Sequence, residues 1–123
     1  MQNDKEKFKD DFKKRLYAFT LKRIEFIESL PEDNVSRRIG DQLLRSGTSI
    51  IGNDVEGQSA SRKKDFTNSF STSLKSSNES KLWFALLRDS KRAGREEVQW
   101  FLSELDEYAK VFASSILMLK GRR

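Results

Sequence analysis

Apolar residues recur along most of this chain at the three- and four-residue spacing of an amphipathic helix. The first stripe stops at Pro31. Because the proline ring disfavours the α conformation for the residue before it, the first helix is expected to end near residue 30. The main members of this stripe are Phe8, Phe12, Leu16, Phe19, Phe26 and Leu30.

Three further apolar stripes follow, separated by short polar connections. Asp33 and Asn34 supply capping oxygens before the second stripe, and Gly57 is the expected stop after it. Glu96 and Glu97 place negative charge in the first turn of the last helix, where the helix dipole favours it. The predicted helices cover residues 5–30, 35–57, 62–90 and 95–120.

Four helices of similar length with short connections pack most simply as an antiparallel, up-down-up-down four-helix bundle. The chain has 123 residues, the usual size of one domain, and we assign residues 1–123 to a single domain. One proline and six glycines are too few for the frequent turns of a β-sandwich or barrel. Charged residues make up 35% of the chain, which amphipathic helices with narrow apolar faces accommodate. The sequence therefore predicts an all-α protein.

Small residues predict close helix packing in two places. Gly40 and Gly47 are seven residues apart and share one face of the second helix, which indicates a close neighbouring helix. The third helix has six serines between Ser69 and Ser80. Serines inside a helix lie either on an exposed face or along a helix–helix seam, and we favour the seam.

The composition excludes much of enzyme chemistry. With no cysteine and no histidine, the chain lacks thiolate metal sites, cysteine nucleophiles and Ser-His-Asp triads. Asp54 with Glu56, or Glu104 with Asp106 and Glu107, could suggest a magnesium site. Residues two apart on a helix point to different sides, so we expect these carboxylates on solvated faces. The predictions are no enzymatic activity, no metal and no cofactor.

The ends and the hydropathy of the chain indicate where the protein resides. Residues 1–10 are charged, and the longest charge-free apolar run, residues 111–119, is too short to cross a bilayer. We therefore expect a cytoplasmic, bacterial-type protein without a signal peptide and without a membrane partner.

The region from Arg45 to Leu87 carries a recognisable pattern. It has an Arg, two small residues, Ser-Ile, an Asn three positions later and Glu-Gly, then a basic turn, a Phe and a Ser–Glu pair three apart. This pattern resembles the family of four-helix-bundle proteins encoded within 23S rRNA intervening sequences. The residues that carry it are Arg45, Ser46, Gly47, Ser49, Ile50, Asn53, Glu56, Gly57, Ser61, Arg62, Phe66, Ser76 and Glu79.

The resemblance carries implications of its own. Ser46 and Gly47 stand where the family usually has alanines, and Asp54 stands where it commonly has an aliphatic residue. Membership implies homo-oligomeric rings, often pentamers. A relative similar in fold, the accessory protein of diversity-generating retroelements, binds a reverse transcriptase and nucleic acid.

A polar stripe accompanies the apolar stripe of the second helix, because four of its residues follow at i, i+4, i+8 and i+11. We interpret it as a partly buried hydrogen-bond network that fixes helix register. A binding or catalytic pocket is the alternative. The network is expected to comprise Arg45, Ser49, Asn53, Glu56, Ser76 and Glu79.

The net charge of +5 gathers at one end of the predicted bundle. We call this the basic end: the starts of the first and third helices together with the ends of the second and fourth. It holds twelve basic against seven acidic residues, whereas the opposite end and the middle balance. A basic end favours polyanions, or it only keeps the protein soluble. The candidate nucleic-acid-binding residues are Lys9, Lys13, Lys14, Arg62, Lys63, Lys64, Lys120, Arg122 and Arg123.

Two tryptophans, Trp83 and Trp100, lie beside the main apolar stripes. Large aromatic residues in such positions either contact another protomer or cap the core, and we favour oligomer contact.

Together these features favour a non-catalytic, ring-forming and pentameric scaffold that binds RNA, DNA or a nucleoprotein partner through its basic rim. The alternative is a protein-interaction adaptor with no nucleic-acid contact, whose partner is a reverse transcriptase or a ribosomal component.

Overall fold

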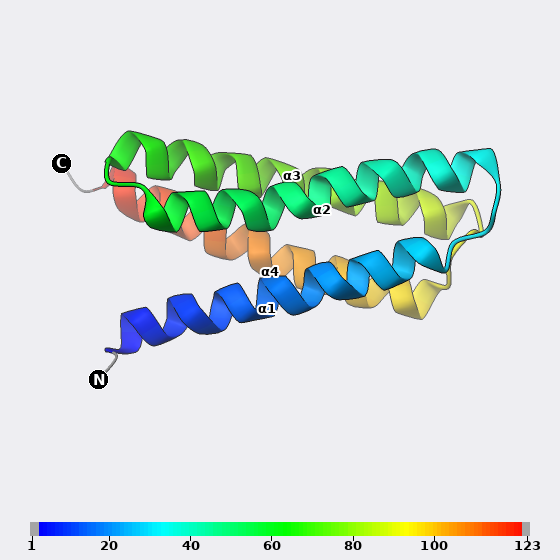
Figure 1. Cartoon of the computed structure of the whole chain (residues 1–123), viewed down its shortest axis with the longest axis horizontal. Coiled ribbons are helices and arrows are strands. Elements are labelled where there is room, and N and C mark those ends of the chain that lie inside the picture. The colour runs from blue at the N-terminus through cyan, green and yellow to red at the C-terminus, as the bar shows by residue number, and fades with distance from the viewer. Residues whose placement is uncertain (1–2, 122–123) are drawn as a thin grey trace.

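The structure, a computed structural model, describes residues 3–121 and forms an all-α four-helix bundle. Figure 1 shows the chain reversing direction at each connection, so successive helices run in opposite directions. The four predicted helices are confirmed, each with bounds within two residues of those expected. The helices are α1 (Asp4–Glu28), α2 (Asn34–Ser59), α3 (Lys63–Asp89) and α4 (Arg95–Lys120).

Side-chain caps fix the starts of the first two helices. The Oδ1 atom of Asn3 accepts a hydrogen bond from the Glu6 amide at 2.8 Å. Asp33, a predicted cap, accepts from the Ser36 amide, also at 2.8 Å. These bonds satisfy amide groups that have no partner within the first turn of a helix.

Gly57 does not end α2, which continues to Ser59, so its predicted role as a stop is wrong. A Cβ atom at Gly57 would lie 2.7 Å from Cε1 of Phe70. The glycine therefore makes room for an aromatic ring of α3 inside the bundle.

Aromatic rings fill the core between α1 and α4. The rings of Phe12 and Phe19 contact Tyr108 edge-on, with centroids 5.7 and 5.0 Å away. Phe26 meets Phe101 at 5.1 Å. Phe8 was predicted on the same buried stripe, but it is 56% exposed. Figure 1 gives the reason, because the first turns of α1 diverge from the other three helices.

Small side chains join α2 to α3, the helix pair in closest contact. Ser80 donates to Oγ of Ser46 at 2.8 Å, and Ser73 donates to the Ile50 carbonyl at 2.9 Å. Four of the six serines are buried, which confirms the predicted seam. We call Ser46, Ser49, Ser73, Ser76, Ser77 and Ser80 the serine seam.

A buried arginine of α1 reaches this seam. Arg23 is fully buried and donates to the Leu43 carbonyl at 2.8 Å and to the Oγ atoms of Ser46 and Ser80. A Cβ at Gly47 would lie 2.7 Å from its Nε. The predicted close neighbour of Gly47 is therefore an α1 side chain. Burial lowers the pKa of Arg23 to about 9.

Candidate nucleic-acid interface

The basic end brings together residues from three helices that are distant in sequence. In Figure 1 the beginning of α1, the α2–α3 connection and the end of α4 lie at the same end of the bundle. The candidate binding residues of the described chain are exposed there, while Arg122 and Arg123 lie outside the described residues. The exposed candidates are Lys9, Lys13, Lys14, Arg62, Lys63, Lys64 and Lys120.

Two arginines at this end have acidic partners. Arg62 forms an ion pair with Asp65 at 2.9 Å. Arg15 pairs with Glu104 at 2.8 Å and with Glu107, and the hydrogen bond to Glu104 raises the pKa of Arg15. Carboxylates thus partly offset both guanidinium charges, so the exposed lysines supply most of the positive field.

The sequence predicted that the acidic residues of α4 lie on solvated faces. This prediction does not hold for all of them. Glu104 is half-buried and accepts a hydrogen bond from the Tyr108 hydroxyl at 2.5 Å. Asp106 pairs with Lys81 of α3 at 2.6 Å. Within residues 3–121, no group of three or more acidic side chains is placed to hold a metal ion.

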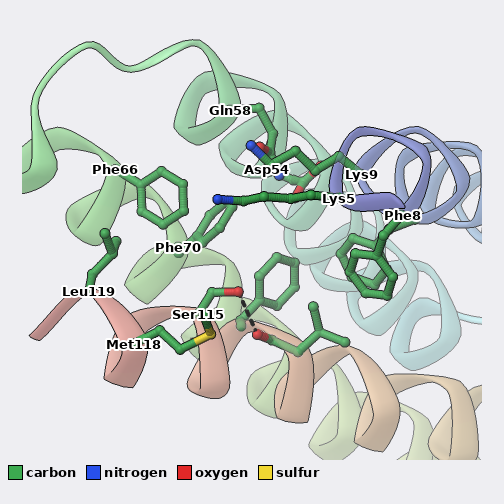
Figure 2. A pocket seen from close by; sticks show the side chains of 13 residues that line it. Lys5, Phe8, Lys9, Asp54, Gln58, Phe66, Phe70, Ser115, Met118 and Leu119 are labelled. Carbon is green, nitrogen blue, oxygen red and sulfur yellow. Dashed lines mark hydrogen bonds between the residues drawn. The ribbon is translucent and has the colours of Figure 1, made fainter. Parts of the chain in front are cut away.

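A pocket of about 330 Å³ opens at the basic end, between all four helices. Figure 2 shows the rings of Phe66 and Phe70 on one side and Phe8 on the other. We call it the Asp54 pocket. It is lined by Lys5, Phe8, Lys9, Phe12, Asp54, Gln58, Phe66, Phe70, Val111, Phe112, Ser115, Met118 and Leu119.

Asp54 is the buried charge of this pocket, and its predicted place on a solvated face is wrong. Its side chain is only 1% exposed. Burial raises the pKa of Asp54 to about 6, although a hydrogen bond from Gln58 and the charge of Lys13 act in the opposite direction. The sequence did contain a signal, because Asp54 follows Ile50 by four residues and so continues the buried stripe of α2.

The predicted polar network lies along the α2–α3 contact. Ser76 donates to Ser49 at 2.9 Å, and Asn53 donates to the Ser49 carbonyl, also at 2.9 Å. Arg45 forms an ion pair with Glu79 at the edge of this contact, where its side chain is 53% exposed. Glu56, further along the same side of α2, is exposed.

The two tryptophans occupy different environments. Trp83 is partly buried against the core. Trp100 is 41% exposed and stacks on Phe19 at 5.8 Å. The Lys22 ammonium group lies 4.7 Å above the Trp100 ring, a cation–π contact. Of the two tryptophans, Trp100 is the one that presents its ring to solvent.

Residues 9–114 match the family described as 23S rRNA-intervening sequence protein. The chain belongs to this family. The match confirms the resemblance found in the sequence, whose motif runs through α2 and α3 of this 23S rRNA-intervening sequence protein.

A solved structure supports the same assignment. It is the crystal structure of a protein of unknown function from the S23 ribosomal protein family of Bacteroides thetaiotaomicron, and it shares 28% sequence identity with this chain. The two align with a TM-score of 0.81 over 88% of this chain and 96% of the other. No curated protein matches. None of the helices within residues 3–121 is long and apolar enough to cross a membrane.

Proposed function

We propose that this protein is a non-catalytic scaffold that binds RNA, DNA or a nucleoprotein partner through its basic end. The observation that carries the proposal is the gathering of exposed lysines from α1, α3 and α4 at one end of the bundle. Lysines in this arrangement neutralise phosphate groups and release counterions, which gives affinity without sequence preference.

The proposal includes self-association into a ring, with five protomers as the expected number. Its support is the exposed apolar surface of Tyr17, Leu21 and Trp100 on α1 and α4. Protomers placed side by side in one orientation would repeat the basic end around a single rim. Light scattering at micromolar concentration tests this part. A mass of one 14.3 kDa chain would contradict it.

Charge reversal tests the nucleic-acid contact. In the first variant Arg62, Lys63 and Lys64 become glutamate at the basic end. The matched control reverses Arg37, Arg38 and Arg95, three exposed arginines at the balanced end, and so changes the net charge equally. Fluorescence anisotropy with a single-stranded RNA at low salt should show strong loss for the first variant and near-normal binding for the control. Equal loss in both would refute a localised site.

A second candidate function is that of a protein adaptor, for a reverse transcriptase or a ribosomal component. The observation in its favour is exposed apolar surface near the basic end, where Leu117 is 69% and Met118 59% exposed. Such side chains suit a protein partner better than a phosphate backbone. The adaptor would be favoured if wild-type protein bound neither RNA nor DNA at low salt.

A further inference from the structure

The Asp54 pocket combines three features that the scaffold function does not use. It has an aromatic wall, buried hydrogen-bond acceptors and lysines at its edge. Its volume of about 330 Å³ falls at the small end of the range for small-molecule sites.

The aromatic wall suits a flat ring. Phe66 and Phe70 of α3 lie with ring centroids 4.1 Å apart, and Phe112 of α4 follows with its centroid 5.5 Å from that of Phe70. Phe8 and Phe12 of α1 stack parallel to each other at 6.1 Å. Aromatic side chains of this kind hold unstacked bases in single-stranded nucleic acids.

Two acceptors in the α2 wall lack donors. Within the described chain, Oδ1 of Asp54 and Oε1 of Gln58 are buried and have no hydrogen-bond partner. A buried acceptor left without a donor costs free energy, and a ligand that donates to it recovers that cost. Asp54 and Gln58 are one turn apart on α2 and line the same pocket, so their two acceptors match the two hydrogens of an amino group.

The acceptors favour a hydrogen-bond donor on the ligand, whereas the lysines at the edge of the pocket favour a negatively charged group. Figure 2 shows Lys5 and Lys9 extending from α1 along the same side of the pocket as Asp54 and Gln58. Their positive charges favour an anion at the mouth and disfavour a lysine or arginine side chain of a partner. A ligand with a flat apolar ring, an amino group and an anionic group satisfies all three features.

A nucleotide has all three groups. We infer that the Asp54 pocket binds an unstacked, amino-bearing nucleobase, with the amino group donating to Asp54 and Gln58 and the phosphate contacting Lys5 and Lys9. The inference rests on the proposed function, since it names the part of a bound strand that the basic end would hold. Uracil is disfavoured, because it carries a carbonyl oxygen where cytosine carries its amino group.

Met118 offers a direct reporter for this pocket. It lines the pocket and is one of two methionines in the chain, so a protein labelled at the methionine methyl groups gives a simple NMR spectrum. Cytidine 5′-monophosphate should shift the Met118 signal saturably, and uridine 5′-monophosphate should bind about tenfold more weakly. Ribose 5-phosphate, which lacks a base, should leave the signal unchanged at the same concentrations.

Asp54→Leu is the decisive variant, because leucine removes the carboxylate acceptors and fills their place in the wall with an apolar side chain of similar length. It should reduce cytidine 5′-monophosphate affinity to the uridine 5′-monophosphate level. Equal affinities for the two nucleotides in the wild type would overturn the inference. The inference would also be overturned if agmatine, a small guanidinium compound, shifted the Met118 signal at lower concentrations than cytidine 5′-monophosphate does. A Met118 signal that changes with protein concentration alone would instead assign the pocket to a second copy of the chain.

Binding of twelve-residue homopolymers separates this inference from the proposed function. Stronger binding of oligo(rC) than oligo(rU), with the difference lost in Asp54→Leu, supports both. Equal binding of the two, abolished by reversal of Arg62, Lys63 and Lys64, would overturn the pocket and keep the scaffold. No oligonucleotide binding alongside a Met118 shift with cytidine 5′-monophosphate would overturn the scaffold and keep a nucleotide pocket.

Discussion

Arg23 and Asp54 are both buried charges without an ion-pair partner in the described chain, yet their surroundings differ. Arg23 lies between the rings of Phe19 and Phe84, at 5.2 and 5.3 Å, and donates to groups of α2 and α3. Both keep buried polar atoms without a hydrogen-bond partner in residues 3–121, namely Nε and Nη2 of Arg23 and Oδ1 of Asp54, but Asp54 borders a pocket. The contrast teaches that a buried charge enclosed by its own chain fixes packing, whereas one beside open volume can serve a ligand.

The largest expected effect comes from emptying the Arg23 site. Arg23→Ala removes the side chain that fills the space beside the serine seam, and the cavity should lower the free energy of unfolding by about 2–5 kcal/mol. Urea denaturation measures this loss. Arg23→Met is the control, because it retains most of the packing while removing the buried charge, and it should cost much less. An alanine variant as stable as the methionine variant would show that Arg23 does not fill the core.

Asp54→Asn should have the opposite sign. Because the pKa of Asp54 is about 6 in the folded protein and 3.8 is its ordinary value, the folded state binds the proton more tightly. The stability that Asp54 contributes is therefore highest below pH 4 and falls as the pH rises toward 6. At pH 7 the asparagine variant should be more stable by about 2–3 kcal/mol.

The pH dependence of this difference is the test. Thermal unfolding of both proteins should give a large difference at pH 7 and a small one at pH 4. Since every other titrating group is common to the two proteins, the difference isolates Asp54. A constant difference between these two pH values would contradict its burial as a charged group.

Two glycines of α2 allow a sharper test of how tightly the Arg23 site is closed. Gly47→Ala places a Cβ against Arg23 and should destabilise the protein by about 1–3 kcal/mol. Gly52→Ala meets nothing within 4 Å and should stabilise it by up to about 1 kcal/mol. Urea midpoints that shift in the same direction for both variants would mean that Arg23 can move aside.

The smallest effect is expected at the surface ion pair of Arg45 and Glu79. Both side chains are partly exposed, so removing either should change the free energy of unfolding by at most about 1 kcal/mol. A double-mutant cycle with alanine at both positions measures the coupling. A coupling free energy as large as the stability loss in Arg23→Ala would mean that this ion pair, and not the core, fixes the helix register.

The helices could be predicted from the sequence because apolar spacing and turn residues are local signals. The serine seam was also foreseeable, since serines at helical spacing form a narrow face. Asp54 was missed because its carboxylate was assigned to a solvated face, and Arg23 was missed because only apolar residues were placed on the buried stripe of the first helix. Phe19, Arg23 and Phe26 share a helical face, as do Ile50 and Asp54, so this spacing could have found both.

The pocket itself could not be predicted. It depends on the divergence of α1 from the other helices, which leaves Phe8 exposed and opens space beside Asp54. Such divergence is set by packing over the whole length of the bundle, and no local pattern around Phe8 distinguishes it from Phe12.

The most direct test of the contrast between Arg23 and Asp54 is a crystal structure of the protein soaked with 5-bromocytidine 5′-monophosphate. The bromine atom gives an anomalous signal that locates the base. We predict a peak inside the Asp54 pocket, beside the phenylalanine rings, and none near Arg23. A pocket that stays empty, or that holds a side chain of a neighbouring copy, would contradict the account.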